Sequence, residues 1–181
     1  LFSVLTYSRN NIWSSEIALW QDNVEKSPQK DRPHNILGNV LNKQGRTEEA
    51  VEHFLRALRI NPESEKTHNN LGLTLNKQGR TEEAIEHYLH ALRINPSYQE
   101  ALNNLGLAFY NQGRTKEAIE NYSHALRINP DYEKAQINLG LAFYNQERTE
   151  EAIERYLQAL RINPESEEAL NNLGLALNDL G

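Results

Sequence analysis

The sequence contains no cysteine and no excess of basic residues. Without cysteine there are no disulfides and no thiolate chemistry, although this absence does not assign a compartment. The 181 residues carry 25 acidic and 19 basic side chains, a net charge of −6. Because no basic excess is available to neutralise a phosphate backbone, we expect no nucleic-acid partner.

Other signals are also missing. No run approaches the roughly 20 apolar residues that span a bilayer. The start has neither an initiator methionine nor a signal-peptide pattern, so we expect a piece of a longer protein, cut at both ends. No glycine-rich phosphate loop and no serine in a nucleophile elbow occurs. We therefore predict that this segment is not an enzyme and that it has no cofactor.

What the chain does contain is an internal repeat of 34 residues. The prolines of an Ile-Asn-Pro motif recur at that interval, at Pro62, Pro96, Pro130 and Pro164. Helix-forming residues are abundant and β-branched residues are few, which predicts an all-α chain. The predicted organisation is a capping segment or degenerate repeat at 1–30, full repeats at 31–64, 65–98, 99–132 and 133–166, and a half repeat with only its first helix at 167–181.

Each unit is predicted to form two helices. In the first, helix A, apolar or small residues recur at unit positions 4, 7, 8 and 11, which is an amphipathic stripe. A turn with glycine in the left-handed conformation should follow, and Glu147 in place of this glycine should cost about 1 kcal/mol. The second helix, helix B, should begin after an N-cap threonine and end before the proline. These threonines are Thr47, Thr81, Thr115 and Thr149.

A glycine at unit position 8 indicates close helix packing. It costs about 1 kcal/mol of helix propensity relative to alanine, so a neighbouring group should require the missing side chain. The aromatic residue at position 24, such as Tyr88, is the expected neighbour. The glycines are Gly38, Gly72, Gly106, Gly140 and Gly174.

The pattern Leu102-x₂-Leu105-Gly106-x₂-Phe109, Ala118-x₃-Tyr122, Pro130 resembles the tetratricopeptide repeat (TPR) family. The resemblance implies a right-handed α–α superhelix, a TPR solenoid of antiparallel helix pairs, with the A helices lining its concave face. One position departs from the family pattern. The tryptophan site holds His34, His68, Leu102, Gln136 and Leu170.

One face of helix A is predicted to bind an extended peptide. Positions 2, 6, 9 and 13 lie within about 60° of one another and point away from the buried stripe. An amide can pair with a peptide backbone, and leucine or tyrosine can accept apolar side chains. The predicted groove residues are Asn35, Asn39, Asn70, Leu73, Lys77, Asn104, Leu107, Tyr110, Asn111, Asn138, Leu141, Tyr144, Asn145, Asn172 and Leu175. The repeats of O-linked N-acetylglucosamine transferase, which are similar in presenting asparagines inward, imply the same use. Alternatively, these asparagines bond between neighbouring A helices.

Two other kinds of site are not expected. A clamp for an acidic C-terminus needs lysine or arginine at position 5 or 6, where this chain has only asparagine or isoleucine. His87 and His90 could both meet an ion from one helix, but no further histidine or cysteine recurs at ligand spacing. We therefore predict no metal site and interpret the histidines as surface residues.

The N-terminal segment carries a second resemblance. Tyr7-x-Arg9-Asn10-x₂-Trp13-x-Ser15-Glu16-x₂-Leu19-Trp20 looks like the junction in transmembrane-and-TPR proteins, relatives of protein O-mannosyltransferases. This implies a membrane tether upstream of Leu1 and repeats on the extracytoplasmic side. Otherwise a cytoplasmic location is expected. In the alternative, Trp13 and Trp20 form a plain cap on the first repeat.

Three functions follow from these patterns. The first is a scaffold that binds a protein or peptide segment. The second is the non-catalytic, substrate-presenting region of a membrane glycosyltransferase. The third is self-association through 167–181, where Leu170, Leu173 and Leu177 should be uncovered.

Overall fold

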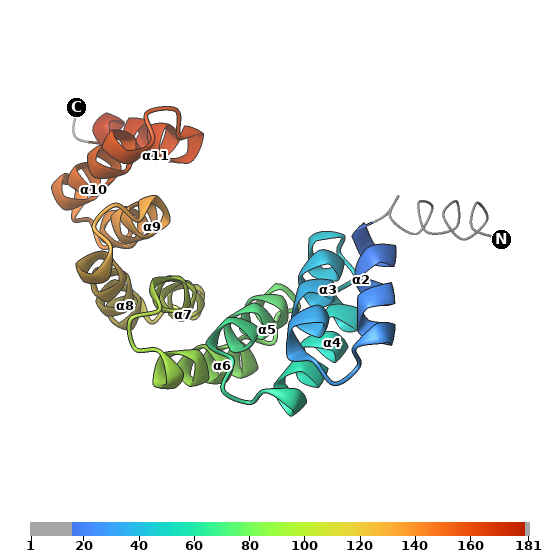
Figure 1. Cartoon of the computed structure of the whole chain (residues 1–181). Helices are drawn as coiled ribbons and strands as arrows, with labels where there is room; N and C mark the ends of the chain where they lie inside the picture. Colours follow the sequence, from blue (N-terminus) through green and yellow to red (C-terminus); the bar gives the residue numbers. More distant parts are fainter. Residues whose placement is uncertain (1–15, 180–181) are drawn as a thin grey trace. The chain divides into compact units, whose positions relative to one another are not determined.

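The computed structural model describes residues 16–179, and within this range every regular element is an α-helix (Figure 1). The helices are α2 (Glu16–Lys26), α3 (Asp31–Lys43), α4 (Thr47–Ile60), α5 (Glu65–Lys77), α6 (Thr81–Ile94), α7 (Gln99–Asn111), α8 (Thr115–Ile128), α9 (Glu133–Tyr144), α10 (Thr149–Ile162) and α11 (Glu167–Asn178). The predicted all-α fold is confirmed. The predictions for Leu1, Tyr7 and Trp13 lie outside the described residues.

The helices fall into two compact units, Leu1–Ile94 and Asn95–Gly181. In each unit, successive A and B helices pack as pairs: α3 with α4 and α5 with α6, then α7 with α8 and α9 with α10. The A helices also approach one another, since α3 lies against α5, and α9 lies against both α7 and α11. Among the described helices, α4 and α6 show no such approach, and neither do α8 and α10. The A helices are therefore the more closely spaced layer of each unit.

Glycine at position 8 allows helix B to approach helix A closely. A Cβ atom built on Gly72 would lie 2.7 Å from Tyr88 Cε1 and 3.1 Å from the carbonyl oxygen of Ala84. The same conflict recurs between Gly38 and Phe54, Gly106 and Tyr122, and Gly140 and Tyr156. At Gly174, no atom of the described residues would lie within 4 Å of such a Cβ. The prediction of close packing is thus confirmed for the four full repeats.

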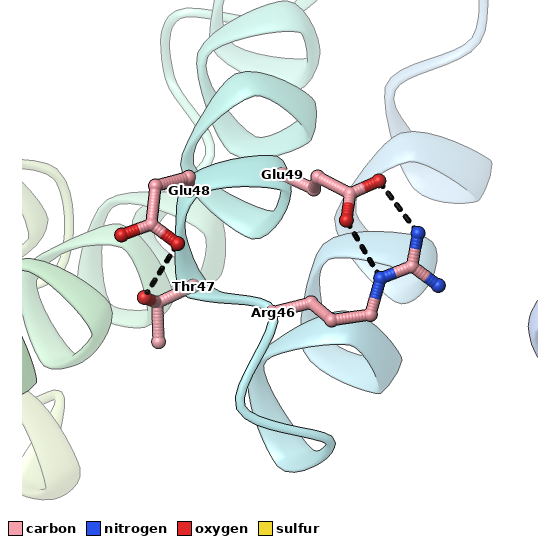
Figure 2. Close-up of polar contacts among 4 residues, drawn as sticks. All are labelled: Arg46, Thr47, Glu48 and Glu49. Carbon is pink, nitrogen blue, oxygen red and sulfur yellow. Dashed lines mark hydrogen bonds and ion pairs between the residues drawn. The ribbon is translucent and has the colours of Figure 1, made fainter.

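The predicted threonine N-caps are wrong. The N-cap of α4 is Arg46, without a side-chain capping bond, and Thr47 is already the first helical residue. Arg46 instead donates from Nε and Nη2 to the Glu49 carboxylate at 2.6 and 2.7 Å, while Thr47 Oγ1 donates to Glu48 at 3.3 Å (Figure 2). Arg114 and Arg148 are N-caps in the same way. Helix B therefore begins one residue earlier than the threonine pattern predicted. An arginine–glutamate ion pair spans its first turn.

The turn between helices A and B uses the left-handed conformation, as predicted. Gly45, Gly79 and Gly113 have φ values of 78°, 76° and 74°. Glu147 occupies the equivalent place with φ 59°. A residue with a Cβ atom is strained in this region, as expected for Glu147.

Helix α11 is only partly uncovered. Leu170 and Leu177 are 49% and 52% exposed, as expected. Leu173 is not uncovered, because it packs against the cluster of Ala152, Tyr156 and Ala176, and the prediction for this residue is wrong. Between Glu16 and Asp179, no helix is both long enough and apolar enough to cross a membrane.

Candidate functional site

Pairs of asparagines join neighbouring A helices in both units. Asn70 Nδ2 donates to Asn35 Oδ1 at 3.1 Å, and Asn138 Nδ2 donates to Asn103 Oδ1 at 2.9 Å. Asn103 is buried, whereas Asn138 is half-buried. The inter-helix bond, the alternative explanation of the asparagine row, is therefore present. An amide has two N–H donors and a carbonyl acceptor, so one such bond does not exhaust its capacity.

Sequence reasoning missed the role of Asn103. The signal was the pair of consecutive asparagines, Asn103 and Asn104, at positions 5 and 6 of α7, which places two amides on neighbouring faces of the same helix. The position-5 residue accepts from the position-6 residue of the following A helix, 35 residues later. The buried amide thus fixes the orientation of the half-buried one.

A row of leucines runs beside the asparagines. Leu73, Leu107 and Leu141 are half-buried, and Leu175 is 59% exposed. Apolar surface of this kind, next to an oriented amide, can contact both the side chains and the backbone of an extended segment. We call this set, together with the asparagines at positions 5 and 6, the asparagine–leucine strip of each unit.

Tyrosines at position 12 form a second set of inter-helix bonds in the unit Asn95–Gly181. The Tyr110 hydroxyl accepts from Asn145 Nδ2, and the Tyr144 hydroxyl donates to Asp179 Oδ2. Burial raises the pKa of Tyr110, and the hydrogen bond to Asp179 raises the pKa of Tyr144. Both phenols are therefore neutral at physiological pH. Asp179, at position 13 of the last unit, was not among the predicted groove residues, and the packing of α11 on α9 places it beside Tyr144.

The remaining predicted groove residues differ in exposure. Asn39, Asn104 and Asn172 are half-buried, and Lys77 and Asn111 are exposed. The structure brings predicted residues into direct contact within a unit, as in the Asn35–Asn70 and Tyr110–Asn145 pairs.

The interpretation of the histidines as surface residues is wrong for two of them. His34 and His68 are 2% and 8% exposed, and each occupies the family's tryptophan position. His34 Nε2 lies 3.3 Å from the Pro28 carbonyl oxygen and His34 Nδ1 lies 3.1 Å from His53 Nδ1. The pair His68 and His87 repeats this arrangement. The missed signal was histidine at both positions 4 and 23 of two consecutive units.

These histidine pairs have the geometry of hydrogen bonds rather than of metal ligands. The facing nitrogens of His68 and His87 are 3.0 Å apart and the ring centroids 5.3 Å apart, so the rings point at each other nearly head-on. Two lone pairs directed at one zinc ion would converge at an angle, with bonds of about 2.0 Å. In the described part of the chain no three histidines or carboxylates are grouped so that they could hold a metal ion.

One stretch of this sequence is similar to a stretch of two curated proteins. The human and mouse protein O-mannosyl-transferase TMTC1 are each 37% identical to it over 60 residues. This alignment covers 33% of the chain, 7% of the human protein and 6% of the mouse protein.

Solved structures share the fold. MamA has a TM-score of 0.73 at 21% identity, with 88% of this chain and 92% of that chain covered. YrrB, described as a TPR protein with an unusual peptide-binding site, has a TM-score of 0.69 at 25% identity, covering 94% and 87%. Cut9 with Hcn1, from the APC/C, gives a TM-score of 0.81 at 19% identity, covering 88% of this chain and 32% of that chain.

The family model of the TPR repeat matches four overlapping stretches, 38–79, 72–113, 107–147 and 142–181. Together they cover far more than half of the sequence, and they include the glycine–aromatic contacts and the helix pairs described above. The chain therefore belongs to the TPR repeat family.

Proposed function

We propose that this chain is a protein-interaction scaffold that holds an extended segment of a partner on the asparagine–leucine strip. The observation that carries the proposal is the oriented amide beside a half-buried leucine, repeated on the A helices. In Asn95–Gly181, the Asn138–Asn103 bond fixes the amide before any ligand arrives. A preorganised amide binds with less loss of side-chain entropy than a mobile one. The peptide-binding site ascribed to YrrB supports peptide binding as a use of this fold.

The strip suits a segment whose sequence varies. Amides pair with backbone groups, which every peptide has, whereas Leu107 and Leu141 favour apolar side chains at intervals. The chain offers binding rather than catalysis on this proposal.

The test uses peptides selected from a random display library on the 181-residue chain. Asn104→Ala combined with Asn138→Ala should weaken binding at least about fivefold, since two hydrogen bonds contribute about 0.5–1.5 kcal/mol each. Loss of the Asn138–Asn103 bond should lower the melting temperature by only about 2–4 °C. Asn121→Ala is the matched control, because Asn121 Nδ2 donates to the Glu117 carbonyl oxygen on the B helix α8. Unchanged peptide binding by the double variant would show that the asparagines act only within the fold.

A second function is favoured by the similarity to TMTC1. On this proposal the repeats present substrate proteins to the active site of a membrane glycosyltransferase encoded by the same gene. Sequencing the gene upstream of Leu1 tests it. A series of membrane spans is expected, and a domain without them contradicts the proposal.

Self-association is a third function, supported by the exposure of Leu170, Leu175 and Leu177 on α11. Sedimentation velocity over a range of concentrations should then show dimers that Leu170→Ser with Leu177→Ser abolishes. Monomers at every concentration would refute it.

A further inference from the structure

Two equivalent pockets lie beside the B helices of the unit Leu1–Ile94. The first, of about 440 Å³, is lined by Val24, Pro28, His34, His53 and Arg56, together with Glu25, Glu52, Leu55 and Arg59. The second, of about 370 Å³, is lined by Leu58, Pro62, His68, His87 and His90, and again by Leu55 and Arg59. The first five residues of each pocket correspond at an interval of 34 in the sequence. The pockets therefore follow the repeat, and they share Leu55 and Arg59 of α4.

The pockets arise where this chain departs from the family pattern. Position 4 is tryptophan in the pattern but histidine here, and imidazole is much smaller than indole. The ring cannot move into the space, because His68 Nε2 lies 3.1 Å from the Pro62 carbonyl oxygen and Nδ1 lies 3.0 Å from His87 Nδ1. The floor of each pocket is thus an imidazole held from both sides.

The hydrogen bonds determine the tautomers of the second pocket. A carbonyl oxygen can only accept, so His68 Nε2 carries a proton and, in the neutral ring, Nδ1 accepts. The proton between the two rings must then belong to His87 Nδ1. His87 lines the pocket, and its Nε2, on the side of the ring away from His68, is the nitrogen left as an acceptor. Burial lowers the pKa of His87 to about 4, so this nitrogen is unprotonated at neutral pH.

Apart from the charged residues, the other walls are apolar or aromatic. Leu58 and Pro62 contribute aliphatic surface, and the exposed Leu55 lines both pockets. In the second pocket His90 stacks on His68 with centroids 5.0 Å apart and planes 10° apart, which presents a flat aromatic face, whereas Arg56 holds the equivalent position in the first pocket. A flat apolar ligand carrying one hydrogen-bond donor complements these walls.

We propose that each pocket takes a tryptophan side chain of a partner protein. Its indole ring packs against the aliphatic wall and the histidine rings, and its N–H donates to His87 Nε2 in the second pocket and to His53 Nε2 in the first. Tryptophan is prominent among the residues that dominate protein interfaces, because it combines a large apolar surface with one donor. The partner's indole thus fills the space that a tryptophan at position 4 would fill in the family pattern.

Charge adds a preference for the residue next to this tryptophan. Arg59 lines both pockets, and within residues 16–179 its guanidinium forms no ion pair. An acidic residue beside the tryptophan can reach it, although Glu25 and Glu52 in the first pocket and Glu63 in the second reduce the net attraction. This site is separate from the asparagine–leucine strip and does not depend on the function proposed for it.

The first experiment titrates the isotopically labelled 181-residue chain with N-acetyl-tryptophanamide and follows the histidine ring nitrogens by NMR. Saturable shifts are expected at His53 and His87 at millimolar ligand. The 1-methyl-indole analogue lacks the N–H and should bind at least about fivefold more weakly. Equal affinity of the analogue would overturn the acceptor role of the histidines. Absence of saturable shifts would overturn the site itself.

Variants then separate the two pockets. His68→Trp fills the second pocket from within, so the response of His87 should be lost while that of His53 persists. His34→Trp should give the reverse, so each variant contains its own control. If either variant fails to fold, Leu55→Glu serves instead, since Leu55 is 40% exposed and lines both pockets. Retention of both responses in any folded variant contradicts the proposal.

The charge preference is tested with two dipeptides. Acetyl-Asp-Trp-amide should bind several-fold more tightly than acetyl-Lys-Trp-amide at low salt, and the difference should shrink as salt is added. Equal binding of the two would overturn the assignment to Arg59.

Discussion

Substitution of Gly72 by alanine should destabilise the protein although it improves helix propensity. The new Cβ atom would lie 2.7 and 2.9 Å from two ring carbons of Tyr88, which is 0% exposed. A shift of the ring would not relieve the whole conflict, because the new Cβ would also lie 3.1 Å from the backbone carbonyl oxygen of Ala84. Overpacking of this kind costs about 1–3 kcal/mol, against a propensity gain of about 1 kcal/mol. We expect a net loss of up to about 2 kcal/mol.

The matched control is Gly174→Ala. No atom of the described residues lies within 4 Å of a Cβ at Gly174, so only the propensity gain remains and stability should rise by about 0.5–1 kcal/mol. Urea unfolding followed by circular dichroism measures both, with the midpoint decreasing for the first variant and increasing for the second. The same substitution at two sites thus has opposite signs in one chain.

A rescue variant tests the assigned cause. Tyr88→Leu removes the ring that the new methyl group meets, so Gly72→Ala should cost less in that background than in the wild-type chain. If Gly72→Ala is stabilising, or if its cost is unchanged by Tyr88→Leu, close approach to the tyrosine is not the reason for glycine at this position.

Three further predictions use the same unfolding assay. Tyr88→Phe should leave the free energy of unfolding unchanged or raise it by up to about 1 kcal/mol. The reason is that the Tyr88 hydroxyl is buried without a hydrogen-bond partner among the described residues, and that Phe54 occupies the equivalent position in the preceding repeat. A loss above about 1 kcal/mol would contradict this prediction. Glu147→Gly should add about 1 kcal/mol, since φ is 59° there, and a decrease would show that the residue is not strained. Burial lowers the pKa of His87 from 6.5 to about 4, so its neutral form contributes stability that is complete above pH 6.5 and is lost as pH falls from 6.5 towards 4. After discounting for partial exposure of the ring, this loss is about 1 kcal/mol, and His87→Gln should make the urea midpoint less sensitive to pH over that range.

Local patterns were sufficient for the helices and the turns. The apolar stripe of helix A and the proline after helix B depend on neighbours a few residues apart, so the sequence predicts them directly. The left-handed turn glycines and the positive φ of Glu147 are of the same kind, and the structure confirms them. The N-cap prediction failed because a threonine before an acidic pair fits both the cap and the first helical position.

The asparagines show where prediction from sequence became ambiguous. A helical wheel places Asn70 and Asn138 on one face of helix A, but it does not tell whether each amide meets a ligand or another helix. Their partners are 35 residues away, and whether the amides meet depends on the spacing of successive A helices.

The sequence by itself determined the period, the helix pairs and membership of a repeat family, because these follow from residue spacing within one unit. Only the tertiary structure decided which atoms face each other between helices. His34 faces His53, and His68 faces His87, across helix pairs in which glycine at position 8 lets helix B lie close to helix A. The two pockets likewise depend on how successive helix pairs stack. Which side chains of separate helices come into contact depends on how those helices are placed relative to each other, and the sequence pattern of one helix does not determine that placement.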